Sequence, residues 1–178
     1  KCGYVDIADY FQVSQTFFEN RKILMRESFD PNQIHIDNAV HYKGQSATTL
    51  IFCTGKKAIQ SQYLYWLPFS LVNDEILYIT PALDFDMLYN RGIFILPKND
   101  QIYRGGSTYN TKDFTLPITK EGKNTLLEKL SGLLKVYYHV TNQKAGIRPA
   151  TKDRRPFIGI HPEIPQIGIF NGLGAKGV

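Results

Sequence analysis

The sequence predicts an α+β fold with a mixed, largely antiparallel sheet and two main helices. Many short apolar or alternating segments are separated by turn residues, which is typical of strands. Only residues 6–20 and 119–137 carry apolar side chains at the spacing of an amphipathic helix. Strands and helices do not alternate regularly along the chain, and this order favours the α+β class.

The two helices have recognisable starts. Asp6 is a suitable N-cap for the first helix, which we expect to end near Asn20. Thr119 can cap the second helix in the same way. The apolar positions of the first helix are Ile7, Tyr10, Phe11, Phe17 and Phe18. The apolar stripe of the second consists of Leu126, Leu127, Leu130, Leu133, Leu134 and Tyr137.

The strands are predicted from alternation, apolar runs and turn residues. Asp37 and Asn38 interrupt one alternating stretch and suit the turn of a hairpin. Residues 48–54 (TTLIFCT) form a nearly continuous apolar run, so we expect a strand buried on both faces that ends at Gly55. From Asn142 onwards we expect strand or loop. The predicted strands are residues 23–29, 33–36, 39–43, 48–54, 76–80, 92–96, 102–106, 157–160 and 168–170.

The composition suits one globular domain, residues 1–178, with a substantial core. Hydrophobic residues make up 43% of the chain and aromatic residues 13%. No apolar run approaches the roughly 18 residues that a transmembrane helix needs. Cys2 and Cys53 show neither a disulfide framework nor a metal-binding spacing, so we expect reduced thiols in a cytoplasmic protein.

The chain is mildly basic, with a net charge of +5. The basic residues gather at one place, Lys152, Arg154 and Arg155. Such a group is either an ordinary solvated surface or a site for an anionic ligand or nucleic acid. Basic charge raises association without specifying the partner, so the composition leaves both interpretations open.

Arg148 is the first candidate for a functional side chain. It lies in a Gly-Ile-Arg-Pro corner, residues 146–149, at the start of the most informative stretch of the sequence, residues 145–178. The planar guanidinium group of arginine suits a carboxylate through two hydrogen bonds. Arg148 therefore either binds the carboxylate of a ligand or bridges an internal acid such as Asp153.

A glycine-rich loop ends the sequence. Gly172, Gly174 and Gly177 have the spacing G-x-G-x-x-G after a short strand. The dinucleotide-binding fingerprint also requires a helix, a second strand and a downstream acid, so the spacing by itself is a weak signal. The loop is either a turn with three permissive residues or a run of amide N–H groups directed at an anion or a carbonyl-rich ring.

Other kinds of site have no support in the sequence. The four histidines, His35, His41, His139 and His161, lack the mutual spacing of metal ligands, and we expect them in surface or turn positions. There is no Ser-His-Asp order and no G-x-S-x-G motif, so a hydrolase triad is not indicated.

Six motifs occur in a fixed order over nearly the whole chain and together resemble a known family. They are Gly3-Tyr4-Val5-Asp6, Leu50-Ile51-Phe52-Cys53-Thr54-Gly55, Phe94-Ile95-Leu96-Pro97, Tyr103-Arg104-Gly105-Gly106-Ser107-Thr108, Gly146-Ile147-Arg148-Pro149 and the terminal glycine loop. With Asp153, Pro156 and Ile158-Gly159, they resemble the FAD-dependent D-amino acid oxidase superfamily. This superfamily includes glycine oxidase, sarcosine oxidase and the oxidoreductase module of a bifunctional tRNA-modifying protein. The C-terminal motif is the most specific part of the resemblance.

The resemblance implies an enzyme that oxidises an amino acid or secondary amine by hydride transfer to FAD. It implies that Arg148 binds the substrate carboxylate, and that Phe94 and Tyr109 line the cavity above the flavin. It also implies that Lys176 stabilises the anionic reduced flavin. The implied cofactor-binding residues are Thr54, Gly55, Gly172, Leu173, Gly174, Ala175, Lys176 and Gly177.

The same resemblance predicts how the chain is organised. The family's ADP-binding βαβ unit has no counterpart in residues 1–178, so we expect a piece of a longer bacterial flavoprotein. By itself this piece is expected to be inactive and not to bind FAD tightly. Residues 1–55 and 145–178 would border the FAD-binding domain, and residues 56–144 would hold the sheet and helix of the substrate domain.

Two alternatives to this function remain open at the level of sequence. The first is the oxidoreductase module of an enzyme that modifies the wobble uridine of tRNA. The second is a non-catalytic binding domain that has kept the fold. The oxidase interpretation requires a small-molecule amine as partner and neither a membrane nor a nucleic acid.

Overall fold

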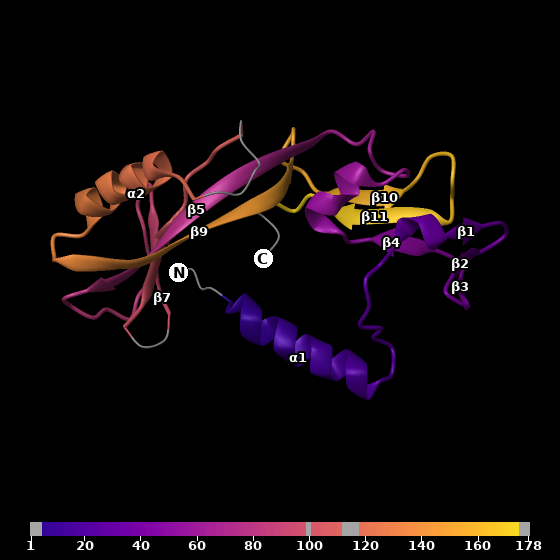
Figure 1. The fold of residues 1–178 in the computed structure, drawn as a ribbon, viewed down its shortest axis with the longest axis horizontal. Helices are drawn as coiled ribbons and strands as arrows, with labels where there is room; N and C mark the ends of the chain where they lie inside the picture. Colours follow the sequence, from indigo (N-terminus) through magenta and orange to yellow (C-terminus); the bar gives the residue numbers. More distant parts are fainter. Residues whose placement is uncertain (1–4, 99–100, 112–117, 175–178) are drawn as a thin grey trace.

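Two sheets with separate hydrophobic cores form the body of the molecule, and a small third sheet lies beside one of them (Figure 1). The structure is a computed structural model that describes residues 5–98, 101–111 and 118–174. The largely antiparallel pairing and the two main helices confirm the predicted α+β class. In chain order the elements are α1 (Ile7–Asn20), η1 (Pro31–Gln33), β1 (His35–Ile36), β2 (Val40–Tyr42), β3 (Gln45–Ala47), β4 (Leu50–Phe52), η2 (Gly55–Gln60), β5 (Phe69–Pro81), β6 (Tyr89–Asn90), β7 (Phe94–Pro97), β8 (Tyr103–Gly106), α2 (Lys120–Leu133), β9 (Tyr138–Thr151), β10 (Phe157–Ile160) and β11 (Ile167–Asn171).

The larger sheet has the strand order β6-β7-β8-β5-β9, and every neighbouring pair is antiparallel. Its longest pair, β5 with β9, runs from Phe69↔Thr151 to Pro81↔Tyr138. In Figure 1 these two strands extend from the larger sheet toward the sheet of β4, β10 and β11. The sequence predicted only residues 76–80 of β5, because the preceding residues include the polar run 73–75.

Helix α2 covers one face of the larger sheet and begins where the sequence predicted. The Thr119 hydroxyl accepts a hydrogen bond of 2.9 Å from the Gly122 N–H, which is the expected N-cap. Leu126 and Leu130 are fully buried. They pack in a core with Leu77, Ile79, Ile93, Ile95 and Tyr103. Tyr137, predicted as part of the helical stripe, lies beyond the end of α2 and is exposed.

A buried carboxylate stabilises the first turn of α2. Glu75 of β5 accepts hydrogen bonds from the Thr119 N–H (3.0 Å) and from the Thr119 hydroxyl (2.7 Å). The Gln143 side-chain amide donates to the same carboxylate from β9. A negative charge at a helix N-terminus is favourable, because the peptide dipoles of the helix point their positive ends at it. Glu75 thus connects α2 to both long strands.

The smaller sheet, β10-β11-β4, has one closed and one open face. β10 is antiparallel to β11, and β11 runs parallel to β4. Phe52 and Ile167 are buried in a second core with Val40, Ala58, Leu64 and Ile169. Ile51, by contrast, is 46% exposed on the opposite face. The prediction that residues 48–54 are buried on both faces is therefore wrong, because nothing in the described part of the chain covers that side of β4.

Other predictions differ from the structure in instructive ways. Residues 23–29 form no strand, because no described strand pairs with them, and Ile23 and Met25 are exposed. The predicted hairpin is confirmed as β1 and β2, whereas β3 and β6 were not predicted.

Helix α1 starts at Asp6, whose carboxylate accepts a hydrogen bond from the Ala8 N–H at 2.9 Å. None of its residues is buried, and Figure 1 shows α1 apart from both sheets.

Among the described residues, neither helix combines the length and the apolar character needed to cross a membrane.

Candidate functional site

A cavity of about 420 Å³ lies where the β5–β9 pair meets the end of β11. Its volume falls within the range of roughly 300–1,000 Å³ that is usual for small-molecule sites. β9 contributes three of the lining residues, and the segment after β11 contributes another three. The lining residues are Val72, Tyr109, Arg148, Ala150, Thr151, Arg154, Gly172, Leu173 and Gly174. Five predicted site residues, Arg148, Tyr109, Gly172, Leu173 and Gly174, are thereby brought together.

Arg148 forms an ion pair with Asp74, not with the Asp153 suggested by the sequence. The guanidinium Nε donates a hydrogen bond of 2.7 Å to Asp74 Oδ2, and Nη2 contacts the same oxygen. In the antiparallel ladder Val72 lies opposite Arg148, so Asp74 is the diagonal neighbour of Arg148 on the same face. The Arg148 side chain is 25% exposed and the Asp74 side chain 15% exposed. Asp74 therefore holds Arg148 in place at the cavity wall.

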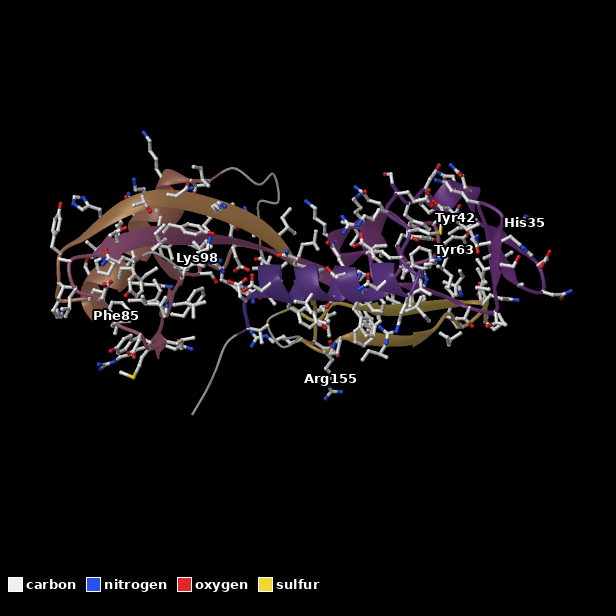
Figure 2. All side chains as sticks on the ribbon, turned by 90° about the horizontal axis from the view of Figure 1, so that it is seen from below. His35, Tyr42, Tyr63, Phe85, Lys98 and Arg155 are labelled. Atoms are coloured by element: carbon white, nitrogen blue, oxygen red, sulfur yellow. The ribbon has the colours of Figure 1, made fainter. Side chains whose placement is uncertain are left out.

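Arg154 is a second positively charged residue that lines the cavity. Unlike Arg148, it forms no ion pair with a described residue. Its backbone has a φ of 62°, in the left-handed region that arginine rarely adopts. The neighbouring Arg155 projects away from the sheets in Figure 2. Of the basic group predicted from sequence, Arg154 is thus the member that faces the cavity.

The turn that presents Arg154 is held by a short polar network. Asp153 Oδ1 accepts a hydrogen bond of 3.0 Å from the Arg155 N–H. This bond lowers the pKa of the Asp153 carboxyl below its ordinary value, and the nearby Thr151 hydroxyl contributes in the same direction. The Thr151 side chain is buried, and its hydroxyl donates to the Arg155 carbonyl at 2.7 Å. An ionised Asp153 therefore favours the observed turn.

The glycine loop after β11 approaches β9 too closely for a larger residue. Gly172 has a φ of 73°, and a Cβ at this position would lie 2.5 Å from Thr151 Cγ2. Gly174 also has a positive φ, of 56°, and faces Ala150. Only glycine adopts such angles without strain, so the loop brings bare backbone to the cavity. The packing of the loop against β9 therefore requires glycine at Gly172.

Thr54 and Gly55 lie close to the loop but do not line the cavity. The Asn171 side-chain amide, at the end of β11, donates a hydrogen bond of 2.9 Å to the Gly55 carbonyl. The Thr54 hydroxyl is buried and has no hydrogen-bond partner within the part of the chain that the structure describes. An unpaired buried hydroxyl is unusual and indicates a position where a further group can bind.

Phe94 is separate from this cavity. It lies on β7, opposite Gly106 of β8, on the face of the larger sheet that α2 does not cover. A Cβ at Gly106 would lie 3.3 Å from the tip of the Phe94 ring. The remaining predicted cofactor residues, Ala175, Lys176 and Gly177, lie outside the described residues.

Two residues of the site were not predicted from sequence in their present roles. Asp74 is remote from Arg148 along the chain, and only the register of β5 against β9 brings the two together. Its one sequence signal is the polar run Asn73-Asp74-Glu75 inside an otherwise apolar strand. Thr151 had no signal, because its role depends on the close approach of Gly172. In the ranges that the structure describes, no group of three or more His, Cys, Asp and Glu residues is arranged for a metal ion.

Comparison with known proteins identifies related sequences and folds. A family model described as FAD dependent oxidoreductase matches residues 16–178. The crystal structure of glycine oxidase from Geobacillus kaustophilus is similar, with a TM-score of 0.67 at 22% identity, over 85% of this chain and 43% of that one. Iminodiacetate oxidase from Chelativorans sp. BNC1 gives 0.63 at 23% identity, over 82% and 44% of the two chains.

A third similar structure is L-α-glycerophosphate oxidase from Mycoplasma pneumoniae, solved with FAD bound. Its TM-score is 0.59 at 17% identity, over 82% of this chain and 45% of that one. At these identities the structures establish a shared fold. The chain spans less than half the length of each of the three proteins.

Proposed function

This chain belongs to the FAD-dependent oxidoreductase family, and from that premise we propose that the whole protein oxidises an amino acid or secondary amine that bears a carboxylate. One observation carries the proposal. One cavity is lined by a fixed arginine of β9 and by a loop after β11 in which Gly172 and Gly174 have positive φ angles. The first suits the anionic end of a substrate, and the second suits a flat cofactor.

The residues present are compatible with part of FAD. The backbone of Gly172, Leu173 and Gly174 borders the cavity without Cβ obstruction at the two glycines. The buried, unpaired Thr54 hydroxyl lies in the segment next to Gly55, which Asn171 ties to the same loop. We assign these residues to cofactor binding. When bound, FAD supplies the acceptor of two electrons for oxidation of a carbon next to an amine nitrogen.

Arg148 binds the substrate carboxylate in this proposal. Its Nε and Nη2 each donate one hydrogen to Asp74, so the two N–H groups of Nη1 and the second N–H of Nη2 remain for a ligand. Asp74 therefore has two effects on substrate binding. It holds the guanidinium plane in one orientation, and it partly balances the positive charge that the substrate meets.

The rest of the cavity orients the substrate. Tyr109 and Val72 provide an aromatic and an aliphatic wall, and Arg154 offers a second positive charge at the turn. A site that fixes the orientation of a bound amine lowers the entropic part of the barrier to its oxidation. No side-chain base is required in this account, because the residues that line the cavity act by binding and positioning.

The proposal is tested by Arg148→Lys in the whole protein. Lysine keeps the charge but loses the planar group, so KM for a carboxylate-bearing amine should rise by about tenfold, with the flavin spectrum unchanged. Arg91→Lys, at an exposed residue between β6 and β7, is the matched control and should leave KM unchanged. Unfolding or loss of flavin in Arg148→Lys would instead limit the role of Arg148 to its structural pair with Asp74.

The same preparation separates the alternatives. A whole protein that binds no flavin would be a non-catalytic binding domain, and retention of tRNA on the protein would favour the tRNA-modifying function. A cytoplasmic location remains a prediction from the cysteine content of the sequence.

A further inference from the structure

The face of the larger sheet opposite α2 carries an unusual group of basic side chains. Successive residues of a strand point to opposite faces. Leu77 and Ile79 are buried beneath α2, so Tyr78 between them projects from the open face. Arg104 of β8 lies directly opposite Tyr78 in the ladder and shares that face.

Three cations surround the Tyr78 ring, and we call them, with Tyr78, the Tyr78 cluster. The Lys144 Nζ lies 5.3 Å from the ring centroid, the Lys98 Nζ 5.8 Å and the Arg104 guanidinium carbon 5.9 Å. Lys144 belongs to β9 and Arg104 to β8, and Lys98 directly follows β7. Figure 2 shows Lys98 in the same part of the molecule as Phe85, which packs against the core beneath α2.

No acidic side chain among the described residues forms an ion pair with a cation of the Tyr78 cluster. Within the described ranges, the ion pairs involve Arg26, His41, Lys43 and Arg148, and none of the three cations of the cluster. Arg104 Nε is buried and has no hydrogen-bond partner among the described residues. Like charges around one ring repel, and a buried N–H without a partner is costly. An oxyanion would relieve both.

There is also space next to the cluster. A hollow of about 460 Å³ follows β9 on the open face, and its lining includes Ile76, Lys144, Gly146 and Arg148. Lys144 thus belongs both to the Tyr78 cluster and to the hollow. The other end of the hollow is the Asp74–Arg148 pair, so an anion would be attracted to the Lys144 end, where no carboxylate of the described residues pairs with the lysine.

We propose that Lys98, Arg104 and Lys144 form a binding site for an oxyanionic group, the phosphate or carboxylate of a small molecule. Arg104 donates from its fork, including the buried Nε, and the two lysines supply charge from either side. Tyr78 sets the spacing of the three cations. The site is distinct from the cavity at Arg148, and it stands whether or not the proposed oxidase activity is correct.

The test is titration of this chain with inorganic phosphate and, separately, with citrate, at constant ionic strength set by sodium chloride. Binding is followed by calorimetry and by the backbone amide signals of Tyr78 and Arg104. We expect saturable binding of at least one anion, weakened about tenfold by Arg104→Gln. Lys144→Gln, at an exposed residue, should weaken it as well. Saturation by phosphate alone identifies a phosphate group, and saturation by citrate alone identifies carboxylates.

A control variant tests whether the effect is specific to the Tyr78 cluster. Lys123→Gln removes the same charge from α2, on the other face of the sheet, and should leave binding unchanged. The proposal is overturned if neither anion saturates, if Arg104→Gln and Lys144→Gln bind as the wild type does, or if Lys123→Gln loses affinity to the same extent.

Discussion

Replacing Asp74 by asparagine removes one charge of the Asp74–Arg148 pair while keeping the shape of the side chain. Arg148 Nε lies 2.7 Å from Asp74 Oδ2, and the two side chains are 25% and 15% exposed. Loss of one partner costs roughly 3–5 kcal/mol for a fully buried pair, whereas an exposed pair contributes about 0–1 kcal/mol. The partial exposure, and the acceptor oxygen that asparagine retains, place the expected loss at about 1–3 kcal/mol.

The assay for Asp74→Asn is urea unfolding of this chain, with Asp86→Asn as the control for an exposed aspartate that has no hydrogen bond or ion pair among the described residues. Arg148→Gln and the double variant complete a mutant cycle, in which we expect a coupling free energy of about 1–2 kcal/mol. If Asp74→Asn changes the free energy of unfolding no more than Asp86→Asn does, and the cycle is additive, the pair does not fix the cavity wall.

Three further predictions concern the stability of the elements around the cavity. Thr119→Ala removes the cap of α2 and a donor to Glu75, so the free energy of unfolding in urea should fall by about 1–3 kcal/mol. An unchanged midpoint would show that the cap contributes nothing. Gly172→Ala places a Cβ 2.5 Å from Thr151 Cγ2 at a φ of 73° and should cost about 2 kcal/mol or more, whereas Gly159→Ala, with nothing within 4 Å, should cost less than Gly172→Ala. Equal losses for the two alanine variants would contradict the close approach. The pKa of Asp153 is lowered in the folded state by the hydrogen bond from the Arg155 N–H, so its stabilising effect is present above the ordinary value of 3.8 and disappears as the pH falls through the folded pKa. The difference in unfolding free energy between the wild type and Asp153→Asn should therefore vanish in acid, and a difference that persists there would refute the assignment.

Local signals in the sequence predicted the helices and the turn-bounded strands well. Asp6 and Thr119 are N-caps in the structure, as their residue types and the following apolar spacing indicated. β10 was predicted with its observed bounds, because Phe157–Ile160 is a short apolar run between turns. These elements depend on interactions within a few residues, which a single sequence contains.

Features that depend on long-range pairing were not predictable in the same way. The first part of β9 contains His139, Thr141 and Asn142, and it is a strand because β5 pairs with it over its whole length. The Asp74–Arg148 pair follows from the register of these two strands, which no local pattern specifies. Residues 23–29 show the opposite case, since a strand-like pattern without a partner strand forms no strand.

Of the candidate site, the sequence predicted the residue types better than their arrangement. Arg148, Tyr109 and the glycines of the loop meet at one cavity, whereas Phe94 lies elsewhere on the open face of the larger sheet. Arg148 does pair with an internal acid, as one of the two alternatives predicted, but that acid is Asp74 and not Asp153. A carboxylate from another strand cannot be identified before the pairing of the strands is known.

The central claim is that the whole protein oxidises an amine whose carboxylate binds at Arg148. Its most direct test is anaerobic mixing of the whole protein with glycine and, separately, with methylamine, the same amine without the carboxylate, while the flavin absorbance is recorded. The account predicts that a carboxylate-bearing amine bleaches the flavin, with iminodiacetate and L-proline tested beside glycine, and that methylamine does not. Bleaching by methylamine as readily as by its carboxylate-bearing counterparts, or a whole protein that contains no flavin, would contradict it.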